Sequence, residues 1–393
     1  MRNTIIAMAV AVFVVGKSFA DDSSNPPVKT FPGVRLRNTF SPKGFHNIES
    51  PGFKAVTFLP SSDRFAAASR AGNVFVWGVD STKPVREIRH RFRIDISEER
   101  NRFADARFGP EGKYVCLAGL YGNTTLWEIE TGKLVGSTEH DLVVCAMAFQ
   151  AKGRCVALAG FRYTEDYEEE GLIVLWDVAD KRKRIILPKK TYRVDAIDFQ
   201  AGGDLLAASH CLIVKDPTDL PRRQHCLWNT ATGNEKSKPE TPKKPVTKLP
   251  YTAFGSSLRF DPQGHYLIGD GERTGSFQSR TGCTFFYNMN DRKVGYVRPG
   301  WFGNLIAFTP DGRYIAHSDD FYKIVVTEHL DSRGRLVKNP RRKPLVEFPK
   351  SRHPVYELPQ VIAFSPKNDK MVVGTVQGKI YLFDIDLEKL EEE

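Results

Sequence analysis

The stretch LIAFTPDGRYIAHSD, residues 305–319, is one of seven copies of a phrase that decides the fold of this chain. In each copy an apolar run ends in Phe, a tight turn rich in Pro, Gly and charged residues follows, and a second apolar run returns. Self-similarity at a period of about 40–60 residues is typical of stacked supersecondary units, each of which buries its faces against its neighbours. The anchoring aromatics are Phe58, Phe108, Phe149, Phe199, Phe260, Phe308 and Phe364.

Each unit continues with two more short apolar stretches, such as LIVLWDV at 172–178 and RIILP at 184–188. Four short strands separated by Gly, Pro, Asp and Asn turns are the pattern of a propeller blade. The sequence therefore predicts an all-β fold, a seven-bladed β-propeller of four-stranded antiparallel blades. The seventh unit ends near Asp386 without a fourth strand, and an open ring would leave unpaired strand edges. We therefore predict that an N-terminal strand formed by Gly33 to Arg37 completes the last blade.

A Trp-Asp dipeptide, Trp176-Asp177, ends the third strand of the third unit. Together with turns of the form Phe-x-Pro-x-Gly, best seen at Phe308 to Gly312, it makes the chain resemble the WD-repeat family, in an exported bacterial form, over roughly residues 50–386. The resemblance implies a protein–protein interaction module. Trp holds the same place in three other units, at Trp77, Trp127 and Trp228.

The chain departs from this family where the family builds a buried hydrogen-bond network. Only Glu139-His140, in the third unit, resembles the family's Gly-His. In units five to seven, Tyr287, Val326 and Phe383 replace the Trp. We therefore expect that side-chain packing and backbone ladders, rather than this network, hold most blades together.

Residues 1–20 have the pattern of a secretory signal peptide. Arg2 precedes an apolar run, and Ser18-Phe19-Ala20 supplies small residues for a cleavage site before Asp21. An uncleaved N-terminal anchor is the alternative, and no other segment reads as membrane-spanning. We predict an exported protein, periplasmic or extracellular. Its expected divisions are a signal peptide at 1–20, a flexible leader and closing strand at 21–47, the propeller at 48–386 and an acidic tail at 387–393.

Export implies an oxidising compartment, in which disulfides can form. Of the six cysteines, Cys116, Cys145 and Cys155 lie in apolar strands and are interpreted as small buried hydrophobic residues. Cys211 and Cys226 flank a polar loop on two strands of one predicted hairpin. A disulfide between them needs a register that lets their Cβ atoms meet, so the sequence leaves it open. His210 and His225 beside them suggest zinc, but adjacent strand residues point to opposite faces and cannot all converge. We predict no metal site.

The two ends of the propeller have different loops. In a four-stranded blade with strands a to d, turns a–b and c–d lie at one end and connections b–c and d–a at the other. The regular Phe-x-Pro-x-Gly turns mark a structural end, here the turn face, and the irregular loops mark the other, the long-loop face, where function concentrates. Arg and large aromatics carry interface energy, and Trp301 is the best anchor unless it packs between blades. The candidate binding residues are Arg89, Arg91, Arg93, Arg222, Arg223, Arg273, Arg298, Trp301, Arg352 and Tyr356.

Catalytic signatures are missing: there is no Gly-x-Ser-x-Gly, His-Glu-x-x-His, Cys-x-x-Cys or Walker-type loop, so no catalytic residue and no cofactor is predicted. The acidic run Glu165 to Glu170 lacks the Gly turn of a calcium loop and could pair with a basic partner or with basic loops of the fourth blade. The net charge of +10 is consistent with a solvated surface or with anionic partners.

We therefore predict a monomeric, non-catalytic interaction or scaffolding module that binds a protein partner, or else an anionic polymer, through its long-loop face. Export and the lack of a nucleic-acid motif count against nucleic-acid binding. The alternative is a propeller hydrolase or lyase with its site at the mouth of the central channel. Several acids or His side chains converging there would favour the enzyme.

Overall fold

A computed structural model describes the part of the chain in which the predicted repeats lie. The predicted signal peptide and the last residues of the acidic tail are outside the described residues. Within those residues, no helix is long and apolar enough to cross a membrane. The described residues are 28–42, 52–89, 103–119, 122–151, 155–186, 191–212, 222–230, 247–253, 258–273, 281–299, 305–320, 322–338, 340–349 and 357–389.

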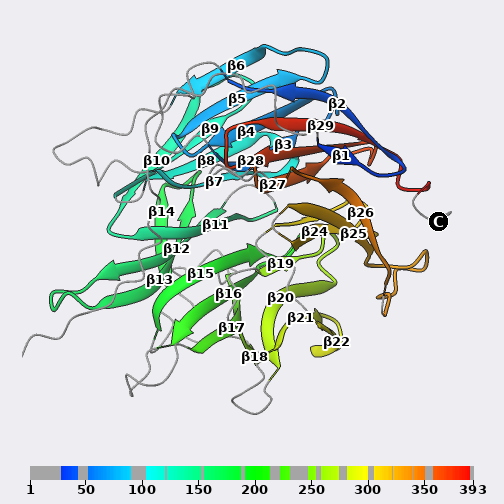
Figure 1. Ribbon diagram of the computed structural model, residues 1–393. Helices are drawn as coiled ribbons and strands as arrows, with labels where there is room; N and C mark the ends of the chain where they lie inside the picture. Colours follow the sequence, from blue (N-terminus) through cyan, green and yellow to red (C-terminus); the bar gives the residue numbers. More distant parts are fainter. Residues whose placement is uncertain are drawn as a thin grey trace, which may run out of the picture.

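Seven antiparallel sheets form a ring, as predicted, and each sheet is one blade (Figure 1). Strand a of each blade is innermost, and among the described residues the strands a of neighbouring blades pack closely at every junction except that between blades 5 and 6. The strands a of blades 1 to 7 are β3 (Phe53–Phe58), β7 (Phe103–Phe108), β11 (Val143–Phe149), β15 (Thr191–Phe199), β19 (Leu258–Phe260), β23 (Ile306–Phe308) and β27 (Pro359–Phe364). The 3-10 turn η2 (Pro110–Gly112) lies in the a–b turn of blade 2.

The other strands follow outward in chain order. Strands b are β4 (Arg64–Ser69), β8 (Tyr114–Gly119), β12 (Cys155–Tyr163), β16 (Leu205–Leu212), β20 (Tyr266–Arg273), β24 (Tyr314–Asp320) and β28 (Lys370–Thr375). Strands c are β5 (Asn73–Gly78), β9 (Gly122–Glu128), β13 (Glu169–Asp177), β17 (Arg222–Asn229), β21 (Thr281–Asn288), β25 (Lys323–Glu328) and β29 (Ile380–Ile385). Strands d are β6 (Pro84–Arg89), β10 (Leu134–His140), β14 (Arg182–Ile186), β18 (Thr247–Ala253), β22 (Lys293–Pro299), β26 (Arg342–Glu347) and, in blade 7, β2 (Val34–Phe40).

The core is divided into seven apolar clusters, one between each pair of neighbouring blades. The central residues of strands b are mostly apolar because both faces of these strands are covered. In β4, for example, Phe65 and Ala67 pack toward blade 7, whereas Ala66 and Ala68 pack toward blade 2. This alternation follows from the two-residue period of a strand. The buried side chains of Trp77, Trp176 and Trp228 fill the space toward the preceding blade.

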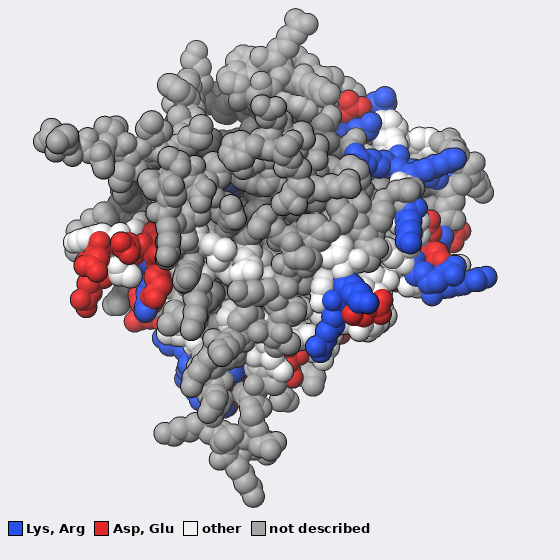
Figure 2. All heavy atoms as spheres, turned by 90° about the horizontal axis from the view of Figure 1, so that it is seen from below, with Lys and Arg blue, Asp and Glu red and all other residues white. Residues whose placement is uncertain are grey.

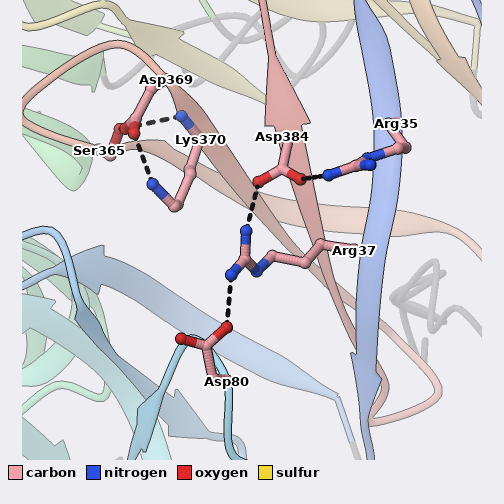
Figure 3. A network of polar contacts seen from close by, with 7 residues as sticks. All are labelled: Arg35, Arg37, Asp80, Ser365, Asp369, Lys370 and Asp384. Carbon is pink, nitrogen blue, oxygen red and sulfur yellow. Dashed lines mark hydrogen bonds and ion pairs between the residues drawn. The ribbon is translucent and has the colours of Figure 1, made fainter.

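The N-terminal strand closes the ring, as predicted. β2 pairs with β29 from Val34 opposite Ile385 to Phe40 opposite Ile380. The guanidinium groups of Arg35 and Arg37 donate to Asp384 of β29, at 2.8 and 3.1 Å, and Arg37 also pairs with Asp80 of blade 1 (Figure 3). One N-terminal strand thus ties the last strand of the chain to the first blade. In addition β1 (Lys29–Thr30) pairs with β26, which the sequence did not predict.

The turn face is held together from blade to blade. In the a–b turns, the amide of Gln150 donates to Asp204 at 2.9 Å and that of Gln200 donates to the carbonyl of Gly264 at 2.7 Å. Gln263 donates to the Asp311 carbonyl at 2.7 Å, and Asn368 donates to the Asp311 carboxylate at 3.0 Å. The turns of five consecutive blades are therefore linked, which supports a structural role for this end.

Two connections differ from the prediction. The stretch 243–251 shows little strand alternation in sequence and favours a loop on the long-loop face, but residues 247–251 belong to β18. On the turn face, the c–d connection of blade 6 is a small hairpin rather than a short turn. In it Leu330 bridges Leu336, and the Asp331 carboxylate accepts hydrogen bonds from Arg335.

The family's buried network is largely replaced, in line with the expectation. His140 lies in β10 of blade 2, one unit earlier than predicted, and contacts Thr124 at 2.9 Å. The indole N–H of Trp127 donates to Thr125 at 3.0 Å. The buried indole N–H of Trp228 has no hydrogen-bond acceptor among the described residues. Packing between blades is therefore what holds this Trp.

Candidate binding site around the ring axis

Five of the predicted binding residues lie at the long-loop end by their backbone position. Arg222 and Arg223 begin β17, Arg273 ends β20, and Arg298 lies one residue before the end of β22. Arg89 ends β6, and its exposed guanidinium pairs with Glu87 at 2.9 Å. The side chains of the other four are not described. The remaining predicted residues, Arg91, Arg93, Trp301, Arg352 and Tyr356, lie outside the described residues.

Cys211 and Cys226 form no disulfide, and both side chains are buried. Strand register is the reason. Cys226 stands opposite Ala208 and Cys211 opposite Arg223, so the two are three register positions apart and lie on opposite faces of the sheet. The Cys211 thiol instead donates to the Asp195 carboxylate at 3.0 Å. Within each adjacent His–Cys pair the two side chains lie on opposite faces, as strand geometry predicted, and the ring of His210 in one pair lies 4.0 Å from the thiol of Cys226 in the other.

The innermost strands share a repeated feature that was not predicted from the sequence. In five of them a β-bulge leaves one residue with no residue directly opposite it in strand b. This bulge residue always lies four residues before the anchoring Phe. Bulges re-aim side chains, and barrel rims and active sites are enriched in them. The fixed offset from Phe could have revealed them. The bulge residues of blades 1, 2, 3, 4 and 7 are Lys54, Ala104, Cys145, Asp195 and Gln360.

The blade 3 bulge explains one glycine. Gly160 of β12 stands opposite Val144, beside the bulge residue Cys145. A Cβ atom on Gly160 would lie 1.9 Å from the Val143 carbonyl oxygen, far inside van der Waals contact. Strand b can follow the bulged strand here only because residue 160 has no side chain.

Charged side chains of different blades influence one another around the axis. Lys54 of blade 1 is affected by Asp105 and Arg107 of blade 2. Arg259 of blade 5 is affected by the same two residues, although blades 2 and 5 are not neighbours, so this influence acts across the axis. We call this set the axial cluster. It comprises Lys54, Arg70, Asp105, Arg107, Cys145, Arg193, Asp195, Asp198 and Arg259.

Each carboxylate of the axial cluster has an ion-pair or hydrogen-bond partner. Asp195 pairs with Arg193 at 2.5 Å, and Asp105 lies 3.8 Å from Arg107. Asp198 accepts the backbone N–H of Phe260, from the inner strand of blade 5, at 2.8 Å. These acids hold cations and a backbone group in place.

Within each of the two ion pairs, the cation is the more exposed partner. The Arg193 side chain is 46% exposed and Asp195 only 4%, and Arg107 is 33% exposed against 14% for Asp105. Lys54 forms no ion pair or hydrogen bond with another described residue. Solvent at the axis therefore meets positive charge first, with negative charge behind it.

Burial shifts the pKa values of several members of this cluster toward their neutral forms, whereas burial of Arg193 is outweighed by nearby Cys145 and Asp195, which raise its pKa. Burial lowers the pKa of Lys54, because the ammonium loses hydration and the nearby Arg70 and Arg107 oppose its charge. It lowers the pKa of Arg259 to about 10 and raises that of Asp198, which Arg259 partly counters. Burial also raises the pKa of Cys145 to about 11, so this thiol is protonated at neutral pH. A bound anion would offset the loss of hydration of these cations and the repulsion among them.

Charge on the rim is unevenly distributed. Acidic side chains gather at the left edge in Figure 2, on the side where Figure 1 has the β12–β13 hairpin, and the opposite edge carries many Lys and Arg together with some acidic side chains. The predicted acidic run lies at the tip of this hairpin. Arg162 of β12 pairs with Glu170 at 2.7 Å and with Asp141 at 3.3 Å. These contacts join the hairpin to the end of blade 2.

The chain matches no protein-family model, and no curated protein is similar to it. The structure supports the propeller architecture that the WD-repeat resemblance implies, and membership of that family stays a prediction.

Proposed function

We propose that this protein is an exported, non-catalytic interaction or scaffolding module that binds a protein partner through its long-loop face. One contrast between the two ends carries the proposal. Polar groups of the turn face form hydrogen bonds from blade to blade, such as the one from Gln263 to Asp311. The long-loop face instead collects the ends of the Arg-bearing strands and the bulged inner strands, on a rigid ring. Function concentrates on such loops when a scaffold positions them.

A cross-linking pull-down from the exported fraction tests the proposal. Trp301→Ala and the Arg222→Ala/Arg223→Ala double variant should lose a partner that the unchanged chain captures, because interface energy concentrates in Trp and Arg side chains. Lys367→Ala, at an exposed position on the turn face, is the matched control and should keep the partner. Unchanged capture by both long-loop variants would reject this choice of face.

A further inference from the structure

We propose that the axial cluster binds the carboxylates of an acidic segment of the partner protein, with Lys54 and Arg193 as the first contacts. This proposal rests on the function proposed above, because it names what the partner presents to the long-loop face. The repeated bulge, the exposure of the charged side chains and the excess of cations over carboxylates support it.

The bulge places the first contacts at the right end. The innermost strands run from the long-loop face to the turn face, and the bulge lies four residues before the Phe that ends each strand. Lys54 is a bulge residue, and Arg193 pairs with the bulge residue Asp195. Arg70, which follows the end of β4 at the long-loop face, adds charge beside Lys54. A partner that reaches this face meets these cations first.

The charges favour an anion. Five cationic side chains of the axial cluster stand against three carboxylates among the described residues. The carboxylates are the less exposed partners in both of its ion pairs. Lys54 is therefore available to an incoming carboxylate without first breaking an ion pair. A cation would have to approach past Arg193 and Lys54, against their charge.

The depth of the cluster favours a segment over a single small anion. Arg107 and Arg259 lie one residue before their anchoring Phe, and Lys54 lies four residues before its own. Three residues of strand span about 10 Å, so the cations form two levels along the axis. Alternate side chains of an extended peptide are about 7 Å apart, so an acidic segment can address both levels.

Binding of a fluorescent hexaglutamate peptide to the full exported protein tests the proposal, with hexaglutamine as the uncharged probe. Lys54→Met should weaken hexaglutamate binding about tenfold or more, the usual loss for a charged hydrogen bond. Lys54→Arg should restore it, since the charge returns. Lys367→Met, on the turn face, should bind as the unchanged chain does. Raising the ionic strength should weaken binding in the unchanged chain more than in Lys54→Met.

Three results would overturn the proposal: hexaglutamate binding no more tightly than hexaglutamine, Lys54→Met binding it unchanged, or a polyphosphate of matched charge binding more tightly than the peptide. The last would assign the site to an anionic polymer. The pull-down separates this proposal from the proposed function. If Trp301→Ala loses the partner and Lys54→Met keeps it at full yield, the long-loop face stands and the axial contact fails.

Discussion

Removing one ring from the closing strand should open the propeller at its seam. Phe40 of β2 is 1% exposed and belongs to blade 7, yet its ring packs against blade 1. Its centroid lies 5.0 Å from that of Phe65, edge to face, and 5.9 Å from that of Trp77. Phe40→Ala therefore removes apolar contacts from both sides of the seam at once.

The expected loss follows from the buried area. A buried Phe removes about 150 Å² or more from water, which at about 25 cal/mol per Å² is worth about 4 kcal/mol. The methyl group that Ala keeps reduces this, and the two aromatic contacts add about 0.5–1.5 kcal/mol each. We expect Phe40→Ala to lower the free energy of unfolding by about 3–5 kcal/mol, the usual range for a buried Phe.

Urea denaturation followed by Trp fluorescence measures this loss, and Trp77 reports on the seam directly. The matched control is Leu36→Ala on the same strand, because Leu36 is 38% exposed and should cost only about 1 kcal/mol. Limited proteolysis should cut the N-terminal segment of Phe40→Ala faster than that of Leu36→Ala. Equal losses in the two variants would refute the idea that burial of Phe40 holds the ring closed.

Three further predictions concern the blades and the axis. Gly160→Ala should lower the unfolding free energy by about 2–3 kcal/mol in urea, because the new methyl group would clash with the Val143 carbonyl oxygen. The exposed-turn variant Gly202→Ala, whose Cβ meets nothing within 4 Å, should cost less. Burial lowers the pKa of His140 to about 4, below its ordinary value of about 6.5. The unfolded chain therefore takes up a proton that the folded chain refuses, so stability should fall as the pH drops from about 6.5 to 4, by about 1–2 kcal/mol for this half-buried group. His140→Gln should flatten that part of the pH–stability curve, and an unchanged slope would contradict it. Finally, an anion at the axis should raise the lowered pKa of Lys54, so binding takes up protons and hexaglutamate affinity should fall as the pH rises toward 10. Calorimetry in buffers of different ionisation enthalpy would detect that proton uptake. Its absence in Lys54→Met would assign the uptake to the Lys54 side chain.

Prediction from sequence succeeded where the signal is local. The anchoring Phe and the Pro-Gly turns mark each a–b hairpin, and at Gly312 the turn residue adopts φ of 70°, a conformation that glycine accepts readily. The closing strand followed from counting, since the seventh unit had three strands and a ring needs a partner for its edge. The strand continues three residues beyond the predicted Arg37, to Phe40, whose ring packs in the cluster between blades 7 and 1.

Prediction from sequence failed, or gave no answer, for properties that depend on strand register. Cys211 and Cys226 looked suited to a bridge because they flank one loop, but a shift of three positions puts them on opposite faces. The candidate Arg residues were chosen by loop membership, and the sequence could not say which charges meet. Lys54, Asp105 and Arg259 are far apart in the chain and were not singled out, since each alone resembles a solvated strand residue.

The sequence by itself determined the number of blades, the order of strands, the closure of the ring and the difference between its two ends. These follow from short-range periodicity and turn chemistry, which act within about 15 residues. Only the tertiary structure decided which charges gather around the axis, where the inner strands bulge and that Cys211 and Cys226 lie on opposite faces of their sheet. Those properties depend on strand register and on ring closure, which bring blades 2 and 5 within electrostatic reach across the axis.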